Sequence, residues 1–330
     1  MPYNLPDWAE TWCTPPKIPS LPFERCNKEG TVNSIRVFGG LTNALKFILL
    51  GSIYSFERDE CFFIDESTAR MRKRKDTSEQ FDSLLQRYFE PMGLSANSAD
   101  VQRAKQQDRV HVLHAVNDLF RSRHTRRAHG DTTELSTLGI NEMDGHAMKK
   151  YMMRRLWRPL PEVRNHTCAT LDTVHGLHDP YLAFSIRRGD KKEVEHFEYQ
   201  DLDDYISQAE PLIVKHFDGV VPNIFVATDD CSVLPEFRKM RPEWTFLSEC
   251  DRMDVEEQGF ALADMSTWTK QQTDAHFRKF FVELYGLAIA KVYIGVSTTN
   301  GTFPCWVVTQ SMVANGYDND DSRALLLCCL

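Results

Sequence analysis

Two adjacent arginines, Arg187 and Arg188, stand directly after an apolar run at residues 181–186. A run of this length predicts a buried strand, and ligands of open α/β sheets bind beyond the carboxyl ends of the strands. The planar guanidinium group binds oxyanions through two parallel hydrogen bonds, which suits a phosphate or pyrophosphate. Asp190 follows closely and could hold one guanidinium in place. The stretch therefore predicts an anion site at the end of this strand.

Strands and helices are predicted to alternate through the rest of the C-terminal half. The further strands are expected at residues 223–228, 244–248 and 291–297, and the helices at residues 201–217 and 273–290. This alternation predicts a parallel sheet that is covered by helices on both sides.

Polar residues follow these strands at the points where they end. Asp229 and Asp230 follow one strand, and Ser297, Thr298 and Thr299 end or follow the last one. Carboxyl ends of parallel strands share one edge of a sheet, so we expect these side chains to gather there and to offer hydroxyls and N–H groups to phosphate. A plainer alternative is equally consistent: the aspartates cap a helix that begins near residue 232, and the hydroxyls are ordinary loop residues.

The N-terminal half contains a second strand–helix–strand pattern, at residues 34–38, 41–58 and 61–64. Gly39 and Gly40 could let a ligand approach the start of the helix, with Asn43 in reach. The GxGxxG pattern of dinucleotide sites is missing, so a plain tight turn is an equal alternative.

Composition limits the classes of protein. A chain of 330 residues favours two domains, expected at 1–165, with a proline-rich tail and a helical insertion, and at 166–330. A net charge of −8 argues against a nucleic-acid partner. The sequence contains no run of 18 apolar residues, so no membrane span is predicted. The nine cysteines include no CxxC pair, so we expect mostly free, buried thiols and no zinc ribbon.

The stretch 185–191, Ser-Ile-Arg-Arg-Gly-Asp-Lys, resembles the strand-end motif of inverting fucosyltransferases that use GDP-fucose, especially the α-1,6 type and its bacterial nodulation relatives. Residues 39–43, 224–230 and 282–299 resemble further family segments in the family's order. The resemblance implies a GT-B-like α/β fold, in which two Rossmann-like domains face a cleft and the C-terminal parallel sheet carries the nucleotide-sugar site.

The resemblance also implies roles for single residues. Arg187 and Arg188 would grip the pyrophosphate, and Glu195 would take the proton from the acceptor hydroxyl. Glu283 would accept hydrogen bonds from guanine. The other donor-site residues are Asp190 and Lys191, which would support the arginines, Asp229 and Asp230, which would face the donor or acceptor, and Ser297, Thr298 and Thr299 in the phosphate loop, with Gly39, Gly40 and Asn43 in the N-terminal glycine loop.

Two residues depart from the family pattern. Ser185 stands where the family has a histidine, and Glu283 stands where it has an aspartate. Glu195 lies in a strongly charged stretch, so a solvated loop carboxylate is an alternative to a catalytic base.

The function expected from the residues and the resemblance is transfer of fucose from GDP-fucose to a hydroxyl of a glycan or glycoprotein, with no metal or other cofactor. Two alternatives are another nucleotide-sugar donor and a non-catalytic glycan-binding protein on a transferase fold. The resemblance places the enzyme in the Golgi lumen if a membrane anchor lies outside this chain, and otherwise the chain would be cytoplasmic.

Overall fold

The computed structural model describes part of the chain in detail, and its contacts divide the chain into two units. One unit is Lys17–Leu160, and the other is Pro161–Leu330 together with Met1–Pro16. The described residues are 13, 26–37, 41–56, 58–65, 85–113, 156–188, 200–252 and 264–295. Within these residues, no helix is both long and apolar enough to cross a membrane.

The unit Lys17–Leu160 contains a three-stranded parallel sheet in the order β2-β1-β3. Its strands and helices are β1 (Asn27–Arg36), α2 (Leu41–Phe56), β2 (Glu60–Asp65), a single turn η3 (Leu85–Arg87), α3 (Ala99–Gln106) and β3 (Val110–Leu113). The predicted strand–helix–strand unit is confirmed, although β1 begins seven residues earlier than predicted. Within residues 85–113 the expected helical insertion amounts to η3 and α3.

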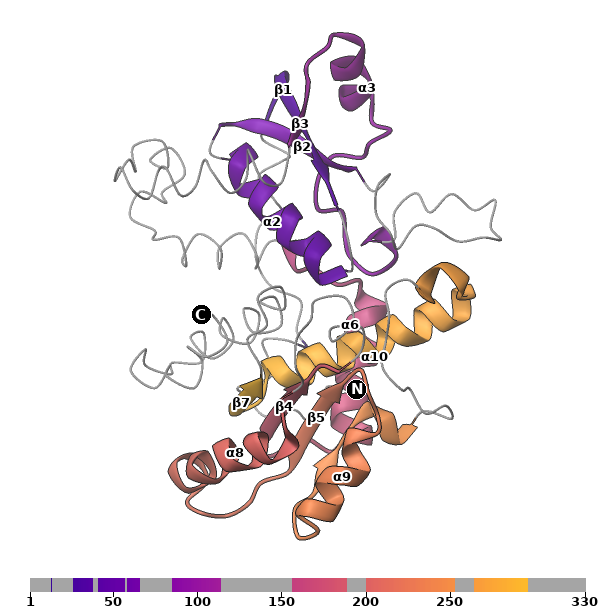
Figure 1. The fold of residues 1–330 in the computed structure, drawn as a ribbon. Helices are drawn as coiled ribbons and strands as arrows, with labels where there is room; N and C mark the ends of the chain where they lie inside the picture. The colour runs from indigo at the N-terminus through magenta and orange to yellow at the C-terminus, as the bar shows by residue number, and fades with distance from the viewer. Residues whose placement is uncertain are drawn as a thin grey trace. The chain divides into compact units, whose positions relative to one another are not determined.

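The unit that contains Pro161–Leu330 has a four-stranded parallel sheet in the order β6-β5-β4-β7. Figure 1 labels β5, β4 and β7 of this sheet. Its main elements are α6 (Pro161–Ala169), the π-helical turn η6 (Thr170–Val174), β4 (Leu182–Ile186), α8 (Leu202–His216), β5 (Ile224–Thr228), α9 (Val233–Met240), β6 (Phe246–Leu247), the 3₁₀ turns η7 (Glu249–Arg252) and η8 (Asp264–Thr267), α10 (Lys270–Ala288) and β7 (Val292–Gly295). The predicted α/β class with a parallel sheet is thereby confirmed, whereas a cleft between two domains stays a prediction.

Even-numbered residues of β4 and β5 face α8 and α9. Phe184 of β4 contacts the rings of Tyr205 on α8 and Phe237 on α9, at centroid distances of 5.6 and 5.4 Å. Phe237 also stacks on Phe246 of β6 at 5.3 Å. These residues belong to one buried core cluster, which includes the apolar residues Leu182, Ile186, Ile224 and Val226 of the same two strands.

Odd-numbered residues of the same strands face α10, because successive side chains of a strand point to opposite faces. Gly286 lets α10 approach closely: a Cβ atom at this position would lie 2.3 Å from the ring of Phe225. The hydroxyl of Tyr181, just before β4, donates to the carbonyl of Gly286. α10 is thus held tightly against this face of the sheet.

Six cysteines form three disulfides, so the expectation of mostly free thiols is wrong for these six. The pairs are Cys13–Cys168, Cys26–Cys61 and Cys231–Cys250. Their separations in the sequence, 155, 35 and 19 residues, gave no pairing signal. The fold brings the partners together: Cys26 stands directly before β1, Cys61 lies in the neighbouring strand β2, and their Cα atoms are 5.1 Å apart.

Candidate functional site

Arg187 and Asp229 lie side by side at the carboxyl edge of the four-stranded sheet. The register pairs Ile186 with Thr228 at the ends of β4 and β5, so the residues that follow are opposite each other. Arg187 Nε lies 3.3 Å from Asp229 Oδ2, and the backbone N–H of Arg188 donates to Asp229 Oδ1 at 2.8 Å. The side chain of Asp229 is 10% exposed and that of Arg187 is 43% exposed. A nearly buried carboxylate therefore orients an arginine that solvent and ligands can reach.

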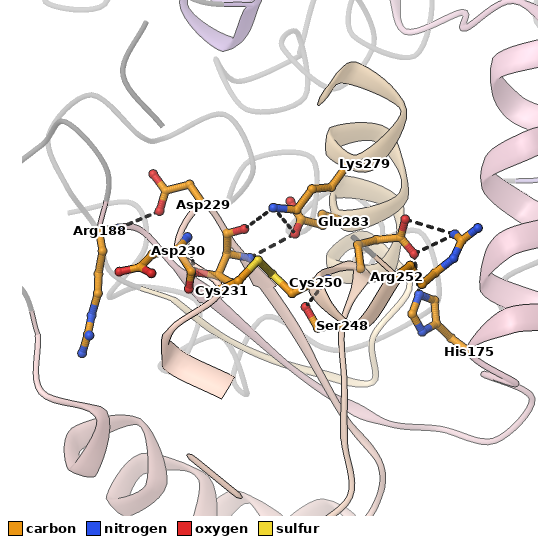
Figure 2. A network of polar contacts seen from close by, with 12 residues as sticks. His175, Arg188, Asp229, Asp230, Cys231, Ser248, Cys250, Arg252, Lys279 and Glu283 are labelled. Carbon is orange, nitrogen blue, oxygen red and sulfur yellow. Dashed lines mark hydrogen bonds and ion pairs between the residues drawn. A yellow bond between two sulfur atoms is a disulfide. The ribbon is translucent and has the colours of Figure 1, made fainter. Parts of the chain in front are cut away.

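The two arginines make contacts on opposite faces of the sheet. Arg187 continues the odd-numbered series of β4, which faces α10. Arg188 continues the even-numbered series, and its Nη1 lies 3.9 Å from Glu236 Oε1 on α9. Figure 2 shows the Arg188 side chain pointing away from Lys279 and Glu283. The Arg187 side chain thus contacts Asp229 and the Arg188 side chain approaches Glu236 of α9, and the joint binding of one pyrophosphate by both stays a prediction.

Two side chains of α10 bind the last residue of β5 through its backbone. Lys279 Nζ donates to the carbonyl of Thr228 at 2.9 Å, and the N–H of Thr228 donates to Glu283 Oε1 at 3.2 Å. The N–H of Ile224, four residues earlier, donates to the carbonyl of Thr245, just before β6. Backbone groups of every second residue in a strand point to the same side, so those of Thr228 also point toward the β6 side. There the pairing of β5 with β6 has already ended. Lys279 and Glu283 thus make the hydrogen bonds to Thr228 that a neighbouring strand would otherwise make.

The predicted guanine-binding residue, Glu283, lies beside this strand end and is 13% exposed. Lys279 Nζ is 3.8 Å from its Oε1, so a buried lysine provides a nearby positive charge. Lys279 was not predicted as a site residue, because in the sequence it looks like an ordinary charged helix residue next to Arg278. A signal was present: Lys279, Glu283 and Gly286 have the i, i+4, i+7 spacing of one helix face.

His276 is a buried imidazole close to two cations. Burial, together with the positive charges of Lys279 and Arg187, lowers the pKa of His276 to about 3. The imidazole is therefore neutral at pH 7, and it lies near two cations that a bound anion would neutralise.

Asp230 has a different role from Asp229. Its Oδ1 accepts from the N–H of Ser232 at 3.0 Å, and its own N–H donates to Thr228 Oγ1 at 3.1 Å. The plainer interpretation, that an aspartate shapes the turn into α9, thus describes the contacts of Asp230. Asp229 instead holds the arginine segment.

The Cys231–Cys250 disulfide joins this turn to a buried ionic group after β6 (Figure 2). Glu249 Oε1 lies 2.7 Å from His175 Nε2, and Arg252 Nη1 donates to Glu249 Oε1 and Oε2 at 3.1 and 3.2 Å. Burial alone would raise the pKa of Glu249, but the hydrogen bonds from His175 and Arg252 outweigh it and lower the pKa. Glu249 is therefore a firmly ionised anchor at neutral pH.

Several predicted site residues lie outside the described part of the chain. These are Gly39, Gly40, Asp190, Lys191, Glu195, Ser297, Thr298 and Thr299, and the side chain of Asn43. Among the described residues, no group of three or more His, Cys, Asp or Glu side chains could hold a metal ion. The metal-free chemistry expected from the resemblance stays a prediction.

The structure resembles solved fucosyltransferases. No protein-family model and no curated protein matches the sequence. The chain is similar to NodZ α-1,6-fucosyltransferase soaked with GDP-fucose, at 14% identity and a TM-score of 0.47, over 84% of this chain and 93% of that chain. It is also similar to NodZ co-crystallised with GDP, at 14% identity and a TM-score of 0.45, over 86% and 91%. A third similar structure is fucosyltransferase NodZ from Bradyrhizobium, at 14% identity and a TM-score of 0.47, over 84% and 93%.

The family named in these structures is the one that the sequence motifs resemble. At 14% identity the likeness concerns the fold alone, so the reaction has to be argued from the residues of this chain.

Proposed function

We propose that this chain is a glycosyltransferase that moves fucose from GDP-fucose to a hydroxyl of a glycan or glycoprotein, with inversion at the sugar carbon and without a metal. The observation that carries the proposal is the half-exposed Arg187, held by Asp229 at the carboxyl edge of a parallel sheet. Nucleotides bind at such edges, and an oriented guanidinium is a strong ligand for diphosphate oxygens.

The charges around Arg187 fit an anionic leaving group. Burial lowers the pKa of His276 most, and Lys279 and Arg187 both lower it further, so two cations act on the same region. As the bond between fucose and phosphate breaks, negative charge develops on the departing GDP, and fixed cations stabilise that charge. In the proposed site the two side chains supply what a metal ion supplies in other transferases.

The acceptor side of the mechanism is assigned to Glu195. Its carboxylate would take the proton of the acceptor hydroxyl while the hydroxyl oxygen attacks the sugar carbon from the face opposite GDP. One C–O bond forms, the bond to phosphate breaks, and the configuration inverts. A positioned base of this kind commonly contributes about 10²–10⁴-fold to the rate.

The donor is tested by thermal shifts of the purified protein with GDP, UDP and ADP, each with and without EDTA. A ligand that binds only the folded state raises the melting temperature by mass action. We expect GDP to stabilise the protein most, with no effect of EDTA. A preference for UDP with a metal requirement would favour another donor, and no response to any nucleotide would favour a glycan-binding protein.

The base is tested by replacing Glu195 with glutamine. We expect Glu195→Gln to bind GDP like the wild type and to transfer fucose at least 100-fold more slowly, in line with the usual contribution of a general base. A Glu195→Gln protein with normal turnover would overturn this assignment. The exposed Glu243, changed to glutamine in the same way, serves as the control.

The disulfides bear on where the enzyme works. Structural disulfides persist in oxidising compartments and are rare in the cytosol. Three of them join described residues of this chain, which favours the lumenal setting implied by the resemblance over a cytoplasmic one. Non-reducing peptide mapping of the purified protein should recover the three cross-linked pairs.

A further inference from the structure

The Cys231–Cys250 disulfide occupies the point where the pairing of β5 with β6 has ended. The two strands pair only through Ile224 with Phe246 and Phe225 with Leu247. Beyond these pairs no strand ladder between described residues joins the two segments, and the segment after β5 carries Asp229 of the candidate site. Cys231 comes directly after Asp230 and Cys250 directly after Glu249, with their Cα atoms 5.5 Å apart.

One end of the disulfide is firmly anchored. Cys250 N–H donates to Ser248 Oγ at 3.3 Å, and the adjacent Glu249 is buried between His175 and Arg252. A buried carboxylate that is paired on two sides is costly to displace. The segment at Cys250 is therefore a fixed reference point within this unit.

The other end of the disulfide leads directly to the arginines. Cys231 lies two residues after Asp229, in a turn whose neighbouring groups are bonded to one another: Asp230 accepts from the N–H of Ser232 and donates to Thr228 Oγ1. A displacement of Cys231 would therefore move this turn as a unit. Asp229 would move with it, and both of its oxygens hold the arginine segment.

We propose that Cys231 and Cys250 are positioning residues for the nucleotide: their disulfide fixes Asp229 against the anchored Glu249 segment, and Asp229 in turn aims Arg187 and holds the backbone of Arg188. The sulfur atoms act through Asp229 and need no contact with the ligand. The identity of the ligand rests on the function proposed above, whereas the positioning of Asp229 does not.

The chain contains its own matched control, the Cys26–Cys61 disulfide of the unit Lys17–Leu160. Removing a disulfide destabilises a protein chiefly by freeing the unfolded chain, and slightly more for a longer loop. The separation is 35 residues for Cys26–Cys61 and 19 for Cys231–Cys250, so the control should lose at least as much stability. A difference in ligand affinity between the two double variants then reports positioning and not stability.

The first measurement is the dissociation constant of GDP by calorimetry. We expect Cys231→Ser/Cys250→Ser to bind GDP about tenfold more weakly than wild type, the loss expected when a charged contact is no longer held in place. Cys26→Ser/Cys61→Ser should bind like wild type. Unchanged affinity in the first variant, or an equal loss in both, would overturn the proposal. If the serine variant does not fold, the corresponding alanine variant is measured instead.

The second measurement needs no nucleotide. The amide of Arg188 donates to Asp229, so its hydrogen exchange reports directly on the position of that carboxylate. We expect this exchange to be at least tenfold faster in Cys231→Ser/Cys250→Ser and unchanged in the control variant. Wild-type exchange in the folded variant would overturn the positioning role. If exchange is faster in Cys231→Ser/Cys250→Ser but the wild type binds no GDP, the proposed function is refuted while the positioning of Asp229 stands.

A third measurement tests the route through Asp229. If the disulfide acts through this carboxylate, its removal should weaken GDP binding no further once Asp229→Asn is present, because coupled residues are not additive. Additive losses would show that the disulfide acts by another route and would contradict the proposal.

Discussion

On the α8 and α9 side of the four-stranded sheet, the even-numbered residues of β4 and β5 build an apolar core, with Phe237 and Phe246 stacked across it. On the α10 side, the odd-numbered residues of the same strands lead to Arg187 and Asp229, and α10 contributes Lys279 and Glu283.

The difference between the two faces follows from a shift of one residue along each strand. Since side chains alternate, the same five-residue strand presents a packing surface to one layer of helices and directs a charged residue toward the other. Both faces bury apolar side chains: Phe225 and Phe281 are buried on the α10 side, as Phe184 and Phe237 are on the other. The α10 side also accepts buried charges, which cost stability unless they are paired. We infer that these charges, rather than the packing, serve the ligand.

The largest effect should come from the packing face. Phe237 is fully buried, and truncation of a buried phenylalanine typically costs about 3–5 kcal/mol. We expect Phe237→Ala to lower the free energy of unfolding by about this amount in urea titrations, while the protein that remains folded binds GDP normally. The exposed Lys239→Ala on the same helix should leave both quantities unchanged. A parallel loss of GDP affinity in folded Phe237→Ala would break the separation of the two faces.

A smaller effect, on GDP affinity and not on stability, should distinguish the two arginines. Arg187 lies on the α10 face with its guanidinium oriented by Asp229, so Arg187→Ala should weaken GDP binding about 100-fold, or about 2.7 kcal/mol. Arg188→Ala keeps the backbone N–H that Asp229 accepts, and the side chain that it removes approaches Glu236 on the α9 side. Because that contact lies away from α10, we expect less than a tenfold loss of GDP affinity. Calorimetry that ranks Arg188→Ala as the more severe variant would contradict the assignment of faces.

The smallest effect should be a pH dependence from the α10 face. Burial and two neighbouring cations, Lys279 and Arg187, lower the pKa of His276 from 6.5 to about 3. Between these values the unfolded chain binds a proton that the folded protein does not, so stability is complete above pH 6.5 and falls as the pH is lowered toward 3. Between pH 7 and pH 5 the wild type should lose about 2 kcal/mol more than His276→Gln. Parallel stability curves for the two proteins would show that His276 titrates normally.

The sequence predicted the elements of the sheet better than the contacts between them. Apolar runs and helical spacing predicted β4, β5, β7, α8 and α10 as elements, because those patterns depend on local periodicity. The start of α10 was placed three residues too late. Thr269 accepts from the N–H of Gln272, and the Gln272 side chain accepts from Thr269, a capping box whose residue pattern was present in the sequence.

Contacts between distant residues could not be predicted in the same way. The disulfide partners depend on which strands are neighbours, and Cys26 and Cys61 come together because β1 lies beside β2. The sequence showed two adjacent arginines, but which of them faces α10 depends on the packing of the helices. Lys279 was missed because a buried lysine is rare; here the carbonyl of Thr228 and the carboxylate of Glu283 contact its ammonium group.

The most direct test of the account is a hydrogen-exchange comparison of the protein with and without saturating GDP. If the α10 face binds the nucleotide, GDP should slow exchange at the amides of Arg188 and Thr228 and along α10 near Lys279 and Glu283. Exchange in α9, on the packing face, should stay unchanged. Protection that is confined to α9, or no protection in either region, would contradict the claim that the charged face of this sheet is the nucleotide site.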